Sequence, residues 1–586
     1  MGEDSVRQTA ILVLFLSDHK ENKQEEKYYY DNGRGAETGI QTNDAPTKYL
    51  LRAAHDNGNE IGDIFCITSR RVYEERIGNS ERTAIDEYRE MLEEFCRAEN
   101  LSIPKIISIE YDFERRDGET RTVDDESRAM HIYRQITGEL ERRANTDQTD
   151  VYIDYTGGLR DVSFLMTTIV RYLEFDNIKC RKIVYSKYDY SADRAHRIYD
   201  IAYIYNMFQM INGVSEFVAT GNARQLSAVY SGQKMQTGKE DEESGKIQRE
   251  FLDSIMAFSN ALSLCNIKAI DQTKDAISRN IGKIMALDTA GAGDGEDPLK
   301  EEMLRTLIPL VRKKMYLDRP EGLSYPNLIR WCVDNRLLQQ AITIYIEKIP
   351  VYCMQQGMLP DFALEVNVED KRGASEETTR FYTALYDCIA DGIELHRFRT
   401  VLENRLNGRR TTQEMTDILR GLERDPQVGG AARRLLQFVE RFGRDRNRQK
   451  IYKCDVREYS GEDFLRKLVS EPYRRKRDLH YFVYNDEQRY KSIPRTTYLK
   501  KVHALTVLKD NKRIREQVKD ADRLLEIMKY YLAIKMIRNR MNHASEEEDS
   551  DDERQAAEAL EGFGIVINSD IGNIQNIMYE ALAAVL

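Results

Sequence analysis

The chain has 586 residues, of which 41% are hydrophobic and 32% are charged, and its formal net charge is −11. This length exceeds what one hydrophobic core usually serves, so we expect two to four domains. No run of about 18 uncharged apolar residues occurs, and the apolar start at 10–16 is too short for a secretory signal, which argues against membrane insertion. The eight cysteines are scattered without a CxxC pair, which argues against zinc and disulfides and indicates the reducing cytoplasm.

The first 190 residues alternate between apolar strands and amphipathic helices. Strands are predicted at 9–16, 63–68, 105–111, 151–155 and 179–186. Helices are predicted at 45–57, at 80–97 with a cap at Asn79-Ser80, at 124–143 and at 159–175, and a polar loop at 17–43. Single helices between strands imply right-handed crossovers and a doubly wound parallel sheet. The predicted fold is therefore an α/β, Rossmann-like domain over residues 1–200.

Polar residues and glycines follow three of the predicted strands, where sheets of this class bind ligands. They are Ser17 and Asp18 after the first strand, Thr68 at the end of the second, and Thr156, Gly157, Gly158 and Arg160 after the fourth. A strand, a glycine turn and a helix together present free backbone N–H groups and a positive dipole end to a phosphate. A tight βα turn that needs glycine for its dihedral angles has the same pattern, so both interpretations stay open at this point.

Two common nucleotide-binding signatures are missing. No GxGxxG motif follows the first predicted strand, where a dinucleotide fingerprint belongs. The glycines at Gly232 and Gly238 have the wrong spacing for a Walker loop, and they follow no predicted strand. If the sheet binds a phosphate-bearing ligand, we expect it to do so without a nucleotide-hydrolysis signature.

From residue 199 onward the pattern is helical. Helices are predicted at 204–218, 249–285, 301–314, 325–353, 378–402 and 495–542. The glycine-rich stretch 289–298 is predicted to be a loop or linker, and the acidic run 546–553 a solvated loop. Trp331, the single tryptophan, lies on an apolar helix face and is expected in the core.

A basic segment lies within this acidic protein. Residues 433–520 contain 25 Lys and Arg against 13 Asp and Glu, a local charge of +12 that leaves −23 for the remainder. Such a segment is a candidate surface for a polyanion. Solvated helix faces would give the same composition, so this alternative is retained.

Four polar residues gather near the end of the last predicted helix. Arg538, Asn539, Asn542 and His543 fall within a sector of about 140° at the helical spacing. An imidazole and a guanidinium without an acidic partner or a set of metal ligands suit phosphodiester cleavage by acid–base chemistry and charge stabilisation. RNA carries its own 2′-OH nucleophile, so the chemistry needs no metal. An arginine also precedes His480 at similar spacing, but Asn539 and the long helix favour His543.

These motifs resemble those of a known family. TGGLR after a hydrophobic strand resembles the ligand turn of CRISPR-associated Rossmann-fold (CARF) sensors, and Arg538-Asn539…His543 resembles the Arg-x4–6-His motif of HEPN ribonucleases. The segment 328–350 also resembles the helical region of one CARF–HEPN branch. The resemblance implies a CARF domain at 1–200, a helical connecting region at 201–430 and a HEPN domain at 431–586. The long helical middle, about 240 residues, departs from the compact members of the family.

The resemblance implies an accessory ribonuclease of type III CRISPR antiviral defence. A cyclic oligoadenylate, cyclic tetra- or hexa-adenylate, would bind the CARF pocket of a cytoplasmic homodimer and activate cleavage of single-stranded RNA. Arg538 would hold the scissile phosphate, His543 would act as acid or base, and Asn539 would orient either one. No metal or cofactor is expected, and the products would carry 2′,3′-cyclic phosphates.

Two other functions are compatible with the same residues. In the first, the protein only senses a nucleotide, and its helices recruit a partner. In the second, it is a ring nuclease that degrades its own messenger in the N-terminal pocket, where Ser17, Thr68 or Thr156 would be catalytic. An RNase assay with and without ligand separates the first alternative from the ribonuclease, and analysis of the messenger after incubation tests the second.

Overall fold

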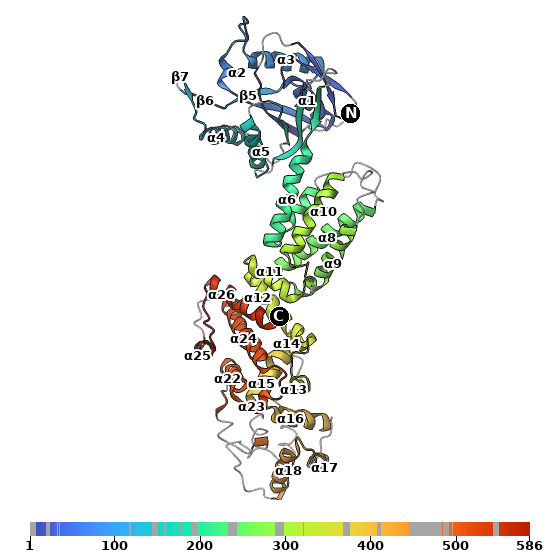
Figure 1. The fold of residues 1–586 in the computed structure, drawn as a ribbon, viewed down its shortest axis with the longest axis vertical. Helices are drawn as coiled ribbons and strands as arrows, with labels where there is room; N and C mark the ends of the chain where they lie inside the picture. The colour runs from blue at the N-terminus through green and yellow to red at the C-terminus, as the bar shows by residue number, and fades with distance from the viewer. Residues whose placement is uncertain are drawn as a thin grey trace, which may run out of the picture. The chain divides into compact units, whose positions relative to one another are not determined.

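The computed structural model divides into two compact units, Met1–Gln209 and Met210–Leu586, which are described separately (Figure 1). It describes residues 8–586 except 19–23, 32, 34, 117–118, 143–149, 158–159, 176–177, 189–195, 232–242, 287–297, 320–321, 367–374, 407–411, 445–482, 485–491, 495 and 543–549. No helix in these described ranges is long and apolar enough to cross a membrane.

The first unit is built on an eight-stranded sheet with the order β3-β2-β10-β9-β8-β1-β4-β5. Its strands are β1 (Gln8–Phe15), β2 (Glu26–Tyr30), β3 (Ala36–Gly39), β4 (Asn59–Thr68), β5 (Lys105–Glu110), β8 (Asp150–Asp154), β9 (Lys179–Lys187) and β10 (His196–Asp200). The five strands from β9 to β5 run parallel, whereas β10 is antiparallel to β9 and β3 to β2. A separate hairpin consists of β6 (Phe113–Arg116) and β7 (Glu119–Thr122). The sheet is therefore mixed but mainly parallel, which confirms the α/β prediction.

The central strand β1 is buried on both faces. Ala10, Leu12 and Leu14 belong to one hydrophobic core, and Ile11 and Val13 to another on the opposite face. Helices α1 (Asp44–Asp56) and α3 (Ala84–Ala98) cover the first face, and α4 (Arg128–Glu141) and α5 (Arg160–Phe175) the second (Figure 1). This burial explains why the first strand reads as a continuous apolar run.

Two predictions in this unit were wrong. The expected loop at 17–43 contains β2 and β3, which extend the sheet because β2 pairs with β10 and buries Tyr28. The helix expected from residue 80 starts at Ala84, where the Asp86 carboxylate accepts hydrogen bonds from the backbone N–H and the hydroxyl of Thr83. Thr83 also forms a β-bridge with Arg76, which holds the preceding residues in a turn.

The second unit is helical. Its helices pack around one main hydrophobic core, whose buried side chains come from residues between Met210 and Val585. Its helices are α6 (Ala202–Thr220, which crosses the boundary between the units), α7 (Arg224–Ser231), α8 (Glu243–Ser263), α9 (Ile267–Ala286), α10 (Pro298–Lys314), α11 (Tyr325–Asp334), α12 (Leu338–Gln355), α13 (Asp361–Leu364), α14 (Glu376–Thr379), the π-helix η3 (Arg380–Leu385), α15 (Tyr386–Asp391), α16 (Ile393–Leu406), α17 (Thr412–Leu422), α18 (Gly429–Arg444), α22 (Thr497–Asp510), α23 (Lys512–Arg515), α24 (Ala521–Asn542), α25 (Asp551–Glu561) and α26 (Ile571–Val585). Trp331 is fully buried and donates its indole N–H to the Val218 carbonyl at 2.9 Å, as expected of a core residue.

Several long predicted helices are interrupted. Helices α8 and α9 replace the helix predicted at 249–285, and the turn between them holds Cys265 at a φ of 48°. A similar turn with Arg336 at a φ of 59° separates α11 from α12, and Gly392 at a φ of 104° separates α15 from α16. Cysteine and arginine rarely mark such positive dihedrals, so the first two turns had no local signal.

The predictions at the acidic run and at the linker had different outcomes. Part of the run 546–553 is helical, because Asp551 begins α25 after Ser550, whose hydroxyl accepts the N–H of Glu553 as an N-cap. Acidic side chains in the first turn are favourable for a helix. Nearly all of the glycine-rich stretch 289–298 lies outside the described residues.

Candidate functional site

The carboxyl ends of β1 and β8 meet at the topological switch point of the sheet. After β1 the chain forms the edge strands β2 and β3 and then crosses to β4 and β5 on one side of β1, and it later returns to β8 and β9 on the other side. Helices that leave neighbouring strands in opposite directions open a crevice at this point, and sheets of this class bind ligands there. Ser17 follows β1 and Thr156 follows β8, so both lie at this edge.

A buried polar network connects the segments at this edge. The Asn43 side chain, directly before α1, accepts the Ser17 N–H at 2.9 Å and donates to Asp154 Oδ2 at 2.7 Å. Asp154 Oδ1 accepts the Thr156 N–H at 2.8 Å, and Thr156 Oγ1 accepts the Ser186 N–H of β9 at 2.8 Å. Four segments distant in the chain are therefore held together where the turn begins.

Asp154 carries the main electrostatic perturbation of this site. Its side chain is fully buried at the end of β8. Burial raises the pKa of its carboxyl to about 6, although the hydrogen bonds from Thr156 and Asn43 act in the opposite direction. These two neutral donors satisfy the carboxylate but bring no positive charge, so desolvation prevails.

Gly157 is required by close packing. A Cβ atom at this position would lie 1.9 Å from the Phe15 carbonyl oxygen, 2.8 Å from Ser17 Oγ and 2.9 Å from Asn43 Oδ1. The φ of Gly157 lies outside the left-handed region, so the glycine serves the close approach of two chain segments rather than an unusual dihedral. Gly158 lies outside the described residues.

The remaining predicted ligand residues are placed differently. Asp18 is partly exposed and forms an ion pair with Arg71 at 3.0 Å, on α2 (Arg70–Glu74). Thr68 is fully buried and shares a hydrogen bond of 2.9 Å with Ser108 Oγ, so it has no surface for a ligand, and the prediction of a ligand contact needs correction there. Arg160 begins α5, but its side chain lies outside the described part of the chain.

The sequence analysis missed Asn43 and Asp154. An asparagine directly before a helix ordinarily accepts hydrogen bonds from the first turn. Asn43 makes no such cap, because its side chain reaches Ser17 and Asp154 instead. An acid in an otherwise apolar strand beside the TGG turn was the available signal for Asp154.

The second group of predicted residues lies on α24. Arg538 Nη1 is 3.4 Å from Glu347 Oε1 of α12, and the two side chains are 30% and 31% exposed. Met536 and Ile537 are buried against the core, whereas Met541 in the last turn of the helix is 42% exposed. The guanidinium is therefore paired with a carboxylate, so the prediction that it lacks an acidic partner was wrong, but it keeps an exposed part that a phosphate could reach.

Asn539 is held from α22. Its side-chain amide donates a hydrogen bond to the Tyr498 hydroxyl. The backbone N–H groups of Tyr498 and Leu499 donate to the Asp552 carboxylate of α25 at 2.9 and 3.0 Å. Burial, followed by the negative charge of Glu553, raises the pKa of Tyr498 to about 12, so its hydroxyl stays protonated at neutral pH.

The two histidines considered from the sequence, His543 and His480, lie outside the described residues. The structure therefore brings Arg538 and Asn539 onto one partly exposed helix end, and the place of the imidazole stays a prediction. Among the residues that the structure describes, no three His, Cys, Asp or Glu side chains gather as metal ligands would.

Most of the basic segment 433–520 also lies outside the described ranges. In its described part, Lys500 forms ion pairs with Asp387 at 3.2 Å and Asp391 at 2.8 Å. Lys501 is buried and also contacts Asp387, at 3.3 Å. These two lysines are therefore engaged inside the protein, which favours a structural role for them over contact with a polyanion.

The chemistry available at the two sites is different. The sheet edge presents a backbone turn over a buried network of neutral donors and one carboxylate, which suits binding more than bond cleavage. The α24 end combines a reachable guanidinium with a fixed amide, which suits recognition of a phosphodiester.

No protein-family model matches the chain, and no curated protein matches it.

Proposed function

We propose that the chain is a ribonuclease activated by a cyclic oligoadenylate, in which the α/β unit binds the activator and the helical unit cleaves single-stranded RNA. It would act as a homodimer in type III CRISPR defence, as the resemblance of its motifs implies. The observation that carries the proposal is that the Thr156-Gly157 turn lies at the switch point of five parallel strands. Sheets of this kind bind nucleotides at that position.

The geometry of the turn supports the sensor half. Asp154 and Asn43 hold Thr156 and Ser17 at the edge, and Gly157 allows β1 and the turn to approach closely. The start of α5 follows Gly157 within a few residues, and in this proposal its N-terminal N–H groups would bind a phosphate of the activator. Tetra- and hexa-adenylate rings are both compatible with this chemistry.

The ribonuclease half is supported by the placement of Arg538 and Asn539. In the proposed reaction the ribose 2′-oxygen attacks phosphorus and the bond to the 5′-oxygen breaks. A base takes the 2′-OH proton and an acid protonates the leaving 5′-oxygen, which yields a 2′,3′-cyclic phosphate and a 5′-OH. His543 would supply one of these proton transfers, the other protomer would supply the second, and Arg538 would stabilise the charge on the phosphate.

An activation titration tests the proposal. The full chain is mixed with labelled single-stranded RNA in EDTA, and the cleavage rate is measured against cyclic tetra- and hexa-adenylate. One of the rings should raise the rate, and linear adenylates of the same length serve as the control. A protein that binds a ring without cleaving RNA would be a binding-only sensor, and the ribonuclease proposal would fail.

The same incubation tests the ring nuclease alternative. Chromatography of the activator after the reaction shows whether the ring is opened. Of the residues that this alternative would make catalytic, Thr68 is fully buried, Thr156 Oγ1 accepts the Ser186 N–H, and Ser17 is partly exposed. A ring that stays intact after full RNA cleavage would rule out this alternative, and an opened ring would support it.

A further inference from the structure

The two side chains proposed to contact the RNA phosphate are each held by a partner from another helix. Arg538 is paired with Glu347 of α12, and Asn539 donates to the hydroxyl of Tyr498 of α22. Arg538 and Asn539 are adjacent on α24, whereas their partners Glu347 and Tyr498 lie far from them in the sequence. Helices α12 and α22 therefore each supply one polar side chain that determines how Arg538 or Asn539 is oriented at the surface.

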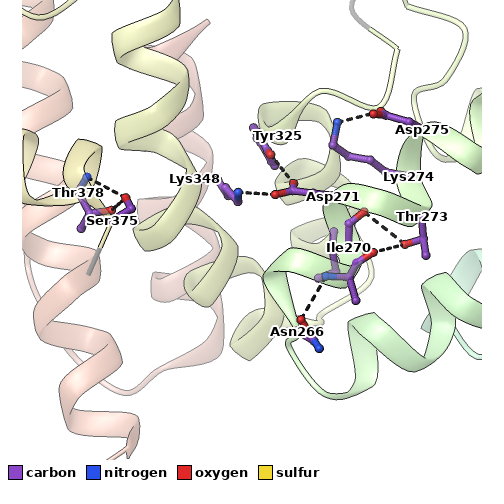
Figure 2. A network of polar contacts seen from close by, with 11 residues as sticks. Asn266, Ile270, Asp271, Thr273, Lys274, Asp275, Tyr325, Lys348, Ser375 and Thr378 are labelled. Atoms are coloured by element: carbon purple, nitrogen blue, oxygen red, sulfur yellow. Dashed lines mark hydrogen bonds and ion pairs between the residues drawn. The ribbon is translucent and has the colours of Figure 1, made fainter. Parts of the chain in front are cut away.

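Glu347 is fixed through its chain neighbours on both sides. The carbonyl of Ile346 accepts a hydrogen bond from the Tyr531 hydroxyl of α24 at 3.0 Å. Lys348 donates to Asp271 of α9, which also accepts the Tyr325 hydroxyl of α11 (Figure 2). Figure 2 shows Lys348 and Tyr325 pointing to Asp271 from two different helices.

The contact with Tyr531 also sets the register between α12 and α24. Tyr531 precedes Arg538 by seven residues, which is about two helical turns, so both lie on the same face of α24. The backbone of α12 therefore contacts this face at Tyr531, and its Glu347 side chain meets Arg538 farther along. The Glu347 carboxylate can therefore orient the Arg538 guanidinium through Nη1 of the arginine, which leaves the other guanidinium nitrogens for a phosphate.

Tyr498 is fixed by the start of its own helix. Its N–H and that of Leu499 share the carboxylate of Asp552, which caps the first turn of α22. An asparagine amide can present either its NH2 or its oxygen to a given side, and a partner at one end decides which. The Tyr498 hydroxyl also forms a hydrogen bond with the Glu553 carboxylate, which only accepts, so the hydroxyl must accept from the NH2 group of Asn539, and this sets the orientation of the amide.

We infer that Glu347 and Tyr498 are positioning residues of the ribonuclease, which orient Arg538 and Asn539 for contact with the scissile phosphate. This inference rests on the proposed function of the α24 site. Glu347 also places a negative charge beside the site where the phosphate binds. It therefore weakens binding of the RNA while it orients the group that stabilises the transition state.

The test measures kcat and KM of RNA cleavage by the full chain at a saturating activator concentration. Tyr498→Phe removes one hydroxyl and should lower kcat about 3- to 10-fold with an unchanged KM, the size expected for one neutral hydrogen bond. Glu347→Gln should lower kcat by a similar factor and also lower KM, because the charge that repels the phosphate is gone. A purely structural role would not separate kcat from KM in this way.

Matched substitutions in the same unit serve as controls. Tyr386→Phe removes a buried hydroxyl that donates to the Met528 carbonyl, and Glu526→Gln removes a carboxylate of α24 that pairs with Lys529 at 2.7 Å. Both should leave kcat and KM at the wild-type values. The thermal midpoints of all variants are compared, so that a loss of folded protein is recognised.

A double-mutant cycle tests whether Tyr498 acts through Asn539. If it does, Tyr498→Phe should have no further effect on kcat in a chain that already carries Asn539→Ala. Additive effects, or single variants with wild-type kinetics, overturn the positioning role. Glu347→Gln with raised cleavage in the absence of activator also overturns it, because Glu347 would then be an inhibitory contact. A wild-type chain that cleaves no RNA at all refutes the proposed function itself, and the positioning roles with it.

Discussion

Ionisation of the buried Asp154 should lower the stability of the N-terminal unit at neutral pH. Burial raises its pKa to about 6, against about 4 for an aspartate in an unfolded chain. Because the folded state holds the proton more tightly, this contribution to the free energy of unfolding is fully present below about pH 4 and is lost as the pH rises through about 6. The difference amounts to about 3 kcal/mol in total, of which roughly 1 kcal/mol disappears between pH 5 and pH 7.

Asp154→Asn removes this titration. The new amide can accept from only one of the two donors, Asn43 and Thr156, so the variant should be destabilised at both pH values. The loss relative to wild type should be about 1 kcal/mol smaller at pH 7 than at pH 5, because only the wild type carries the ionisation penalty at pH 7.

Hydrogen exchange of peptides from β1 and β8, measured at both pH values, gives the free energy of opening for this unit. Trp331 is the single tryptophan and lies in the helical unit, so its fluorescence during urea unfolding is an internal control. The difference between wild type and Asp154→Asn in the urea unfolding followed by Trp331 fluorescence should not change with pH. If the exchange of β1 and β8 shows the same loss at pH 5 and pH 7, the assigned burial effect on Asp154 is refuted.

Three further outcomes are expected. Arg538→Ala and His543→Ala should each abolish RNA cleavage and leave activator binding intact, as measured with end-labelled RNA and by equilibrium binding; metal-dependent cleavage with 5′-phosphate ends would contradict the mechanism. Gly157→Ala should destabilise the N-terminal unit by more than about 1 kcal/mol, because the added methyl meets the Phe15 carbonyl, and unchanged hydrogen exchange in β1 would argue against this. Arg160→Ala should raise the activator concentration for half-maximal cleavage about 10- to 100-fold without changing the maximal rate, and overlapping activation curves would disprove its role.

Much of the α/β unit was predictable because its central strands are buried on both faces. The runs at 9–16 and 63–68 are apolar or nearly so, and they correspond to β1 and the end of β4. The helices between them carry an apolar stripe at helical spacing, which also requires no knowledge of the partner. The helices expected between these strands then predicted that the strands run parallel, although the chain between β1 and β4 also contains β2 and β3.

The strands at the sheet edge were not predictable from local pattern. β2 and β3 are short, and only Tyr28 in β2 is strongly buried. Their hydrogen-bond partners are each other and β10, which comes more than a hundred residues later in the chain. Pairing at that distance supplies the stability that their own composition lacks.

The candidate site shows the same difference between residues that a local pattern identifies and residues that depend on distant partners. Ser17, Thr156 and Gly157 could be selected because polar residues and glycines directly follow apolar strands. The partners that hold such residues could not be selected, since Asn43 meets Asp154 across 111 positions and Glu347 meets Arg538 across 191. Apolar spacing depends on neighbours along the chain, whereas the partner of a polar side chain depends on which strands and helices pack together.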